Sequence, residues 1–206
     1  MSLLATWQRE AFEERLQPNP HAIALATVDA SGHPSVRMVL CKRLDTERGE
    51  VVFYSDRTSR KGRAMEAHPH AAAVFYWGPQ GRQARVEGAV RIVEASEADA
   101  YFASRPSDSQ VGAWASQQSR PVASRAALER RVAEEAARLG VEPGDAPEPG
   151  IPRPPHWVGY ALELETVELW VSRPGRSPDR AVWARERGGS GAEATWSPWA
   201  ATRLQP

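Results

Sequence analysis

The sequence predicts a mainly β protein of the α+β class, in which an antiparallel β-barrel carries peripheral helices. Five strand-like runs succeed one another between residues 22 and 94 with one short helix among them, and another strand-like run begins at residue 157. Sequential strands joined by short links pair as antiparallel sheets. The other helical patterns gather at the N-terminus and at about 96–140. Because helices do not alternate with strands throughout, a doubly wound α/β fold is excluded.

Composition limits the possible partners. The 206 residues include 26 Lys+Arg and 26 Asp+Glu, so the formal net charge is zero and no global basic field favours nucleic acid or an anionic membrane. Cys41 is the only cysteine, which excludes an internal disulfide and a Cys-rich metal site. The N-terminus has no secretory-signal pattern, and no window approaches ~18 uninterrupted apolar residues. We therefore expect a cytoplasmic protein with no metal, membrane or nucleic-acid partner.

The first half of the chain predicts a helix followed by strands. Residues 3–16 place six apolar side chains on one helical face, namely Leu3, Leu4, Trp7, Ala11, Phe12 and Leu16. Strands are expected at 22–29, 35–44, 51–56, 71–78 and 82–94. A short helix is expected at 58–69, because Thr58 or Ser59 can cap its start and Pro69 lies past its end.

The next section predicts three helices and a loop. The helices are expected at 96–105, 108–116 and 124–140. The third has an apolar stripe formed by Leu128, Val132, Ala136 and Leu139. Gly140 is a typical C-terminal stop for this helix, and the proline- and glycine-rich stretch 141–156 predicts a surface loop.

The last long strand-like run, 157–172, changes its apolar parity. Its large apolar residues have even numbers at first, at Leu162 and Leu164, and odd numbers later, at Val167 and Leu169. Because side chains alternate between the faces of a strand, such a change predicts a bulge or bend near Glu165–Thr166.

Two basic stretches are candidates for anion binding. Arg37 and Lys42 belong to the strand-like "RMVLCK", where a charge costs free energy unless it is paired or used. They are five residues apart, so a regular strand would point them to opposite faces, and only a bulge or a site reached from both sides would bring them together. Ser59, Arg60 and Lys61 stand at a helix start, where backbone N–H groups, a hydroxyl and two cations form a phosphate cradle. The alternatives are a barrel rim and an exposed basic turn.

A third stretch, "YFASRPSDSQ", spaces Tyr101, Arg105 and Ser109 four residues apart. They would share one helical face if Pro106 starts the next helix without spoiling their convergence, and together they could hold a phosphate. The alternative is a helix face with a packed tyrosine and a solvated arginine. His68 and His70 fit a surface loop better than a metal pair, because no third ligand is near in sequence.

Taken together, these stretches resemble the pyridoxamine 5′-phosphate oxidase family of FMN-dependent oxidases. The similarity runs from about residue 20 to the final "RLQP", and its most specific part is "YFASRPSDSQVGAWASQQS". The resemblance implies an FMN-binding split β-barrel and a homodimer with two FMN sites at the subunit interface. It also implies a single domain over 1–206, with a helical segment at about 96–140 and a C-terminal dimerisation and substrate region at about 157–206.

The resemblance further implies roles for individual residues. FMN would be bound by Arg37, Met38, Val39, Leu40, Lys42, Tyr54, Ser55, Arg60, Lys61, Gln83, Gln118, Ser119, Trp170 and Arg180. The substrate phosphate would be bound by Lys42, Tyr101, Arg105 and Ser109. Arg176 would be the catalytic residue, lying over the substrate ring, while Pro178 stands where the family has a substrate-facing histidine. Asp179 could orient Arg176 or Arg180.

The implied reaction is hydride transfer from C4′ of pyridoxamine or pyridoxine 5′-phosphate, both B6 vitamers, to flavin N5, followed by reoxidation with O2 and release of hydrogen peroxide. Two departures keep other functions open. The segment before Trp7 is shorter than the family's arm, so we expect its substrate lid to be missing, and Pro178 lacks the histidine's polar contact. The alternatives are a family oxidase acting on another compound, such as a secondary-metabolite intermediate, and a non-catalytic carrier of flavin or pyridoxal phosphate.

Overall fold

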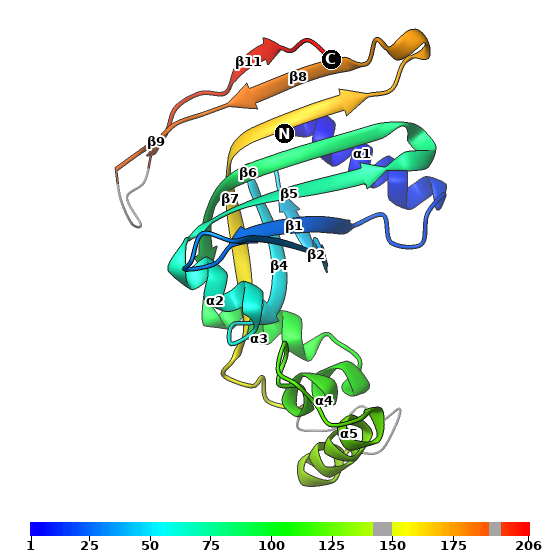
Figure 1. Cartoon of the computed structure of the whole chain (residues 1–206), viewed down its shortest axis with the longest axis vertical. Coiled ribbons are helices and arrows are strands. Elements are labelled where there is room, and N and C mark those ends of the chain that lie inside the picture. Colours follow the sequence, from blue (N-terminus) through cyan, green and yellow to red (C-terminus); the bar gives the residue numbers. More distant parts are fainter. Residues whose placement is uncertain (142–149, 190–194) are drawn as a thin grey trace.

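The computed structural model describes residues 1–141, 150–189 and 195–206, and within these ranges the side chain of Arg176 is not described. A strongly curled antiparallel sheet forms the body of the molecule, an N-terminal helix packs its apolar side chains into the core of this sheet, and a helical arm extends from one end (Figure 1). This is the mainly β architecture with peripheral helices that the order of patterns predicts.

Nine strands form the main sheet, and all their pairings are antiparallel. They are β1 (Ala22–Val28), β2 (Pro34–Leu40), β3 (Arg43–Asp45), β4 (Glu50–Asp56), β5 (His70–Trp77), β6 (Arg82–Ile92), β7 (Trp157–Val171), β8 (Asp179–Ala184) and β11 (Ala200–Arg203). Their order is β11-β8-β7-β6-β5-β1-β2, and β4 pairs with both β7 and β3. A separate two-stranded sheet pairs β9 (Arg187–Gly188) with β10 (Thr195–Trp196).

The prediction of a single strand at 35–44 is wrong, because the chain turns between β2 and β3. The Cys41 N–H donates to the His21 carbonyl at 2.8 Å, and the Lys42 N–H donates to the Val52 carbonyl at 2.7 Å. The chain therefore leaves β1 for β4 within two residues, which brings the two edges of the curled sheet together. Apolar periodicity cannot detect this change of partner, since both segments are equally strand-like.

The parity change in the last long strand marks a β-bulge, as predicted. Glu87 pairs with Thr166, whereas the next residue, Gly88, pairs with Leu164, so that Glu165 is the extra residue of β7. The first half of β7 pairs with β4 and its second half with β8. The bulge therefore lies where β7 passes from one neighbour to the other, and the strand bends there.

The described residues form five α-helices. They are α1 (Ser2–Glu14), α2 (Arg60–Ala67), α3 (Ala95–Ala103), α4 (Ser107–Ala115) and α5 (Arg125–Leu139), and two short 3₁₀ turns lie at Gly78–Gln80 and Pro174–Arg176. Ser59 caps α2, since its Oγ accepts from the Gly62 N–H at 3.3 Å. No described helix is long and apolar enough to cross a membrane.

Two predicted helical faces are only partly buried. On α1, Leu4, Trp7 and Ala11 are buried, while Leu3, Phe12 and Leu16 are 45–54% exposed. The buried residues follow the narrow i, i+3, i+7 stripe, and the helix ends before Leu16. On α5, Ala136 and Leu139 pack against the arm's core, whereas Leu128 and Val132 remain exposed.

The core has a large cluster inside the sheet and a smaller one in the arm. Trp77, Phe53 and Phe75 are fully buried in the large cluster, where Trp7 of α1 also packs. The smaller cluster joins α3, α4 and α5 to the start of β7 through Phe102, Val111, Val141, Ile151 and Trp157. Trp157 thus connects the helical arm to the sheet.

Gly88→Ala is expected to lower the free energy of unfolding by about 1–3 kcal/mol, because a Cβ there would lie 1.9 Å from the Glu163 carbonyl oxygen beside the bulge. Gly112→Ala in α4 is the matched control. A Cβ at Gly112 meets nothing within 4 Å, so alanine should stabilise the helix by about 0.8 kcal/mol. Urea unfolding measures both changes, and equal stability of the Gly88→Ala variant and the wild type would contradict the close approach.

Candidate functional site

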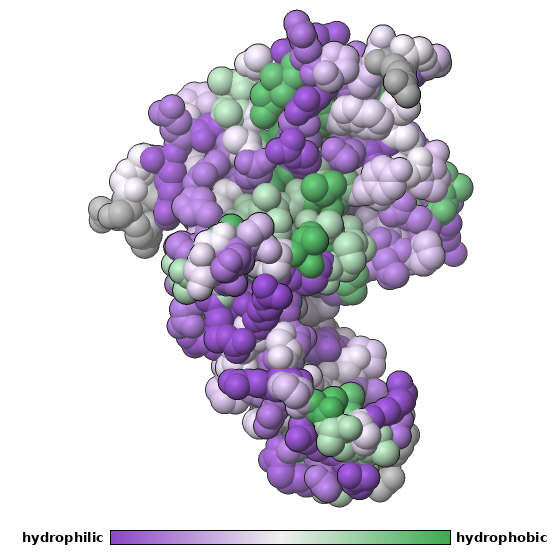
Figure 2. All heavy atoms as spheres, viewed as in Figure 1, coloured by the Kyte–Doolittle hydropathy of each residue, from purple (hydrophilic) through white to green (hydrophobic). Residues whose placement is uncertain are grey.

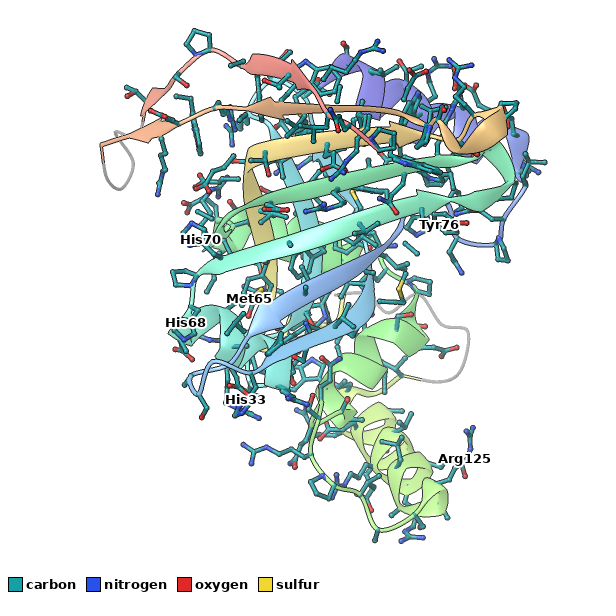
Figure 3. All side chains as sticks on the ribbon, turned by 45° about the horizontal axis from the view of Figure 1, so that its top comes forward. His33, Met65, His68, His70, Tyr76 and Arg125 are labelled. Carbon is teal, nitrogen blue, oxygen red and sulfur yellow. The ribbon has the colours of Figure 1, made fainter. Side chains whose placement is uncertain are left out.

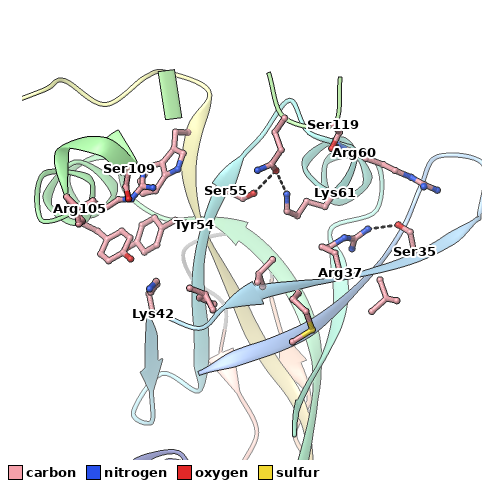
Figure 4. Close-up of a pocket in the computed structure, with 18 residues that line it drawn as sticks. Ser35, Arg37, Lys42, Tyr54, Ser55, Arg60, Lys61, Arg105, Ser109 and Ser119 are labelled. Carbon is pink, nitrogen blue, oxygen red and sulfur yellow. Dashed lines mark hydrogen bonds between the residues drawn. The ribbon is translucent and has the colours of Figure 1, made fainter. Parts of the chain in front are cut away.

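One cavity of about 730 Å³ gathers most of the predicted site residues (Figure 4). Its size is within the range of small-molecule and cofactor sites. It lies between β2, β4, the start of α2, the α3–α4 junction and the segment 116–119. The lining residues are Ser35, Val36, Arg37, Met38, Val39, Leu40, Lys42, Tyr54, Ser55, Arg60, Lys61, Tyr101, Arg105, Pro106, Ser109, Gln118, Ser119 and Trp157.

The start of α2 forms one end of the cavity. The Arg60 N–H donates to Ser119 Oγ at 3.2 Å, and Lys61 Nζ donates to Ser59 Oγ at 3.2 Å and also to Gln118 Oε1. Hydroxyl groups, a side-chain amide and two cations therefore meet at a helix N-terminus, which favours a phosphate. Ser119 has a φ of 69°, so the short segment that carries it is held in a left-handed conformation that non-glycine residues seldom adopt.

Lys61 is a buried cation that forms no ion pair in the described residues, although the nearby Asp56 carboxylate partly offsets the lowering of its pKa. Its side chain contacts a hydroxyl and an amide oxygen only, and the residue is 8% exposed. The pKa of Lys61 is lowered to about 8, mainly by burial and secondly by repulsion from Arg37. An anion bound here would offset both effects.

Arg37 is held from behind by polar groups of β1 and β2. Its Nη1 donates to the Leu25 carbonyl at 3.0 Å and to Thr27 Oγ1 at 2.9 Å, and its Nη2 donates to Ser35 Oγ at 2.5 Å. These neutral partners orient the guanidinium and leave its charge in place. Burial, followed by repulsion from Arg60, lowers the pKa of Arg37.

The turn between β2 and β3 resolves the parity problem of Arg37 and Lys42. Lys42 lies beyond the end of β2, at the point where the chain changes partner, so the alternation of β2 no longer applies to it. Both residues line the same cavity, at different ends (Figure 4).

The α3–α4 junction forms the second end of the cavity. Tyr101, Arg105 and Ser109 all line it, although Tyr101 lies on α3, Arg105 between the helices and Ser109 on α4. Pro106 is the N-cap residue of α4, so it starts the helix without spoiling the convergence. Gln110 fixes the junction, because its Nε2 donates to the Arg105 carbonyl at 2.7 Å.

Trp157 is a cavity residue that sequence reasoning missed. Its ring is parallel to that of Tyr54, with centroids 5.1 Å apart, and Tyr54 stacks on Tyr101 at 4.1 Å. Gly159 makes room for this stack, since a Cβ there would lie 2.7 Å from the Tyr54 ring. The only sequence signal was the position of the tryptophan at the start of a strand, and nothing in the sequence showed that this strand pairs with β4.

Tyr54 reaches the helical arm through its hydroxyl, which donates to Glu97 Oε1 at 3.4 Å. Burial, followed by the nearby Glu97 charge, raises the pKa of Tyr54 to about 12, so the phenol stays protonated at neutral pH. Tyr54 therefore acts on the cavity mainly through its ring.

The cavity's five basic side chains have almost no carboxylate partners. In the described part of the chain, no carboxylate oxygen lies within 4.0 Å of Arg37, Lys42, Lys61 or Arg105, and Arg60 has only Asp29 at 3.9 Å. Figure 4 shows Lys42 and Arg105 at one side of the cavity and Arg37, Arg60 and Lys61 at the other. The cavity is thus electropositive at two separate ends.

Three predicted cofactor residues lie outside this cavity. Gln83, Trp170 and Arg180 are paired with one another in a row across β6, β7 and β8. Arg180 forms a two-point ion pair with Glu168 at 2.8 and 3.0 Å. Pro178 comes directly before β8 and does not line the cavity either.

The predicted catalytic side chain, Arg176, lies outside the described part of the structure. The expectation that Asp179 orients Arg180 is wrong. The Asp179 carboxylate accepts from Arg173 at 2.9 Å and lies 3.6 Å from Arg203, while Arg180 pairs with Glu168.

Two minor candidates lie away from the cavity. His68 and His70 are at the periphery, between α2 and β5 (Figure 3), and His70 Nε2 lies 3.4 Å from Glu165. Cys41 is buried, and burial raises the pKa of its thiol to about 11, so a reactive thiolate is not formed near neutral pH.

Comparison with known protein families shows to which family this chain belongs. Residues 8–138 match the family model described as pyridoxamine 5′-phosphate oxidase, and residues 157–206 match the pyridoxine 5′-phosphate oxidase C-terminal dimerisation region. The chain belongs to the pyridoxamine 5′-phosphate oxidase family. It is 51% identical over 185 residues to the pyridoxine/pyridoxamine 5′-phosphate oxidase of Azorhizobium caulinodans, covering 89% of this chain and 82% of that protein. It is 48% identical over 206 residues to the enzyme of the same name from Maricaulis maris, covering 100% and 85%.

Two solved structures share this fold. PhzG from Burkholderia lata 383, in complex with tetrahydrophenazine-1-carboxylic acid, has a TM-score of 0.84 and 33% identity, covering 100% of this chain and 91% of that one. A pyridoxamine 5′-phosphate oxidase-related, FMN binding protein from Nostoc punctiforme has a TM-score of 0.71 and 16% identity, covering 98% and 96%, and supports the fold alone. The split-barrel prediction is confirmed.

Membership of the oxidase family also confirms FMN as the cofactor. The described residues fit such a group. The buried, unpaired charge of Lys61 and the helix N-terminus beside it suit a phosphate, and the apolar residues Met38, Val39 and Leu40 follow Arg37 along the cavity wall.

Lys61 should make the stability of the cofactor-free protein depend on pH. Its folded pKa of about 8 is below its ordinary value of 10.5, so between these values the unfolded chain binds more protons at this site. The free energy of unfolding should therefore rise with pH across this window, and the cost of burying the charge is fully present below pH 8. Urea unfolding of the wild type and of Lys61→Met at several pH values measures this slope, which Lys61→Met should lack.

Arg60→Met is the matched control for this experiment, because Arg60 is a neighbouring but exposed cation. Its stability should follow the wild-type pH dependence. Parallel curves for the wild type and Lys61→Met would contradict the lowered pKa.

Proposed function

We propose that this protein oxidises pyridoxamine 5′-phosphate or pyridoxine 5′-phosphate to pyridoxal 5′-phosphate, with FMN as cofactor and O2 as final acceptor. One observation carries the proposal: the same cavity has two separate cationic ends, built on different elements. One bound phosphate would require one such end. Two ends suit a phosphorylated cofactor and a phosphorylated substrate that meet in the space between them.

The end formed by α2 is assigned to the FMN phosphate. Arg60 and Lys61 supply the charge, while Ser119 and Gln118 supply polar contacts beside the helix N-terminus. Arg37 would lie along the cofactor, since it is oriented from behind by β1 and β2.

The end formed by the α3–α4 junction is assigned to the substrate phosphate. A phosphate monoester near charge −2 is matched by the cations of Lys42 and Arg105, and the hydroxyls of Tyr101 and Ser109 supply further donors. Holding the phosphate fixes the distance between the substrate ring and the cofactor, which is the main contribution that the protein makes to such a reaction. When bound, FMN supplies the hydride acceptor, and oxygen returns it to the oxidised state.

The row of Gln83, Trp170 and Arg180 is assigned to the FMN site of a second copy of the chain. These residues lie outside the cavity of their own chain, in or beside the region that matches the dimerisation model. On β2, the residues Val36 and Met38, which also line the cavity, are 67% and 62% exposed. Figure 2 shows hydrophobic residues gathered at the middle of the face where Figure 1 places β2, which supports an apolar contact between two copies.

Arg176 and Pro178 belong to the same C-terminal region and are assigned to the substrate ring. The arginine would lie over the ring as the catalytic residue. The proline leaves one side of the ring without a side-chain hydrogen bond, because it has neither a polar side chain nor a backbone N–H.

A second candidate function is oxidation of a different ring compound. Two observations favour it: Pro178 replaces the expected histidine, and the PhzG structure holds tetrahydrophenazine-1-carboxylic acid. That ligand, as named, carries a carboxylate and no phosphate, so it would leave the cations of the α3–α4 end without their full counter-charge. The phosphate-binding end therefore favours the B6 substrate.

The FMN-loaded protein, mixed without oxygen with pyridoxine 5′-phosphate or pyridoxamine 5′-phosphate, should lose its visible flavin absorbance. Admitting air should restore the absorbance and produce hydrogen peroxide. Unphosphorylated pyridoxine is the control. Its kcat/KM should be lower by a factor of about 100 or more, because several charge-assisted hydrogen bonds are lost. Bound FMN that neither phosphate ester reduces would overturn the proposed reaction, and tight binding of pyridoxal 5′-phosphate without turnover would favour a carrier.

Pro178→His should restore one hydrogen bond to the substrate ring. We expect kcat/KM for pyridoxine 5′-phosphate to rise about threefold to tenfold, the usual effect of one such bond. Pro174→His in the same loop is the control and should leave kcat/KM unchanged. An unchanged or lower value for Pro178→His would favour a pocket that is shaped for another substrate.

A further inference from the structure

Arg105 lies in a corner formed by two aromatic rings. Its guanidinium carbon is 4.9 Å from the Trp157 ring centroid and 5.6 Å from that of Phe102. The two rings meet edge to face, with centroids 5.1 Å apart and an interplanar angle of 70°. Both distances are within the range of cation–π attraction. The aromatic corner therefore fixes the direction in which this half-buried cation points.

The Arg105 charge is left uncompensated. In the described residues, no carboxylate forms an ion pair with it, and its Nη1 is buried without a hydrogen-bond partner. Burial lowers the pKa of Arg105, yet an arginine stays protonated at neutral pH. The unpaired N–H groups are thus available to an anion in the cavity.

Two other half-buried arginines of this chain, Arg91 and Arg180, are held by carboxylates instead. Arg91 pairs with Glu50 at 2.5 Å and with Glu163 at 3.1 Å, and Arg180 pairs twice with Glu168. A carboxylate fixes a guanidinium firmly, but it also neutralises the charge that a ligand would use. An aromatic face orients the cation and leaves that charge in place.

Trp157 is well placed to give this orientation because its own position is fixed. It pairs with Asp56 across β4 and β7, its N–H donates to the Pro154 carbonyl at 3.0 Å, and its carbonyl accepts from Arg153 at 2.5 Å. Its side chain is 7% exposed and stacks on Tyr54. A rigid strand of the barrel therefore determines where an arginine of the helical arm points.

We propose that Trp157 is a positioning residue for phosphate recognition: it holds the Arg105 guanidinium toward the cavity without neutralising it. The ligand class is a phosphate monoester dianion. The inference rests on the proposed function only in assigning this end of the cavity to the substrate, and Trp157 itself need not touch the ligand.

The test compares three variants of the FMN-loaded protein. Trp157→Leu removes the aromatic face, and Trp157→Phe keeps one. Trp114→Leu is the matched control, since Trp114 packs against the same arm cluster and carries an arginine, Arg138, at 4.8 Å, but does not line the cavity. The measurements are KM and kcat for pyridoxine 5′-phosphate, the Kd of inorganic phosphate by calorimetry, and the Kd of FMN. Loaded FMN blocks the other phosphate end during the titration.

Trp157→Leu should raise KM and the Kd of inorganic phosphate about tenfold, with kcat and the Kd of FMN within twofold of wild type. Trp157→Phe should recover most of the loss, and Trp114→Leu should change none of the four values. Equal loss of FMN and phosphate affinity in Trp157→Leu, or the same loss in Trp114→Leu, would reduce Trp157 to a general packing residue and overturn the proposal.

A double-mutant cycle tests whether Trp157 acts through Arg105. In an Arg105→Ala background, Trp157→Leu should weaken phosphate binding by less than twofold, because the group that it orients is gone. A further tenfold loss there would overturn the proposal.

The phosphate titration separates this inference from the proposed reaction. A wild-type protein that binds inorganic phosphate through Trp157 and Arg105, but oxidises neither B6 ester, would keep the inference and remove the reaction. A wild-type protein that oxidises both B6 esters, together with a Trp157→Leu variant whose phosphate affinity is unchanged, would keep the reaction and remove the inference. A wild-type protein that binds no phosphate at this end would contradict the inference directly.

Discussion

The pairing of β4 with the first half of β7 is the constraint on which the site depends. It sets Asp56 opposite Trp157 and Tyr54 opposite Gly159, so that the cavity's aromatic wall is built from segments 100 residues apart in sequence. The same strand, β4, leads directly into the capped start of α2, and the same end of β7 packs against the helical arm. One antiparallel register therefore brings both cationic ends of the cavity to the same barrel.

Charge placement explains why this cavity differs from the rest of the surface. Elsewhere, buried carboxylates such as Glu50 and Glu168 neutralise the arginines beside them. The cavity instead orients its cations with neutral groups: Thr27 holds Arg37 and Trp157 holds Arg105. Uncompensated, partly buried charge costs stability, and bound anions would recover that cost. Such a cavity is typical of a site that binds phosphorylated ligands.

Family membership and substrate choice depend on different parts of the chain. Both domain models match, and FMN follows from the family. In our proposal, the substrate depends on the α3–α4 junction and on the C-terminal loop around Pro178, where the resemblance led us to expect a histidine. The two observations favour different substrates. The junction suits a phosphate ester, whereas the loop lacks one polar contact to a B6 ring.

The sequence by itself determined the class of fold, a bulge or bend near Glu165–Thr166, a helix cap at Thr58 or Ser59, and the groups of cations. Each of these follows from local periodicity or local hydrogen bonding. It could not determine the turn after β2, since both segments have strand-like composition and only long-range pairing decides where one partner is exchanged for the other. For the same reason it missed Trp157, whose role depends on a register with β4. Tertiary structure alone decided which cations share a cavity and which are neutralised, because that depends on neighbours distant in sequence.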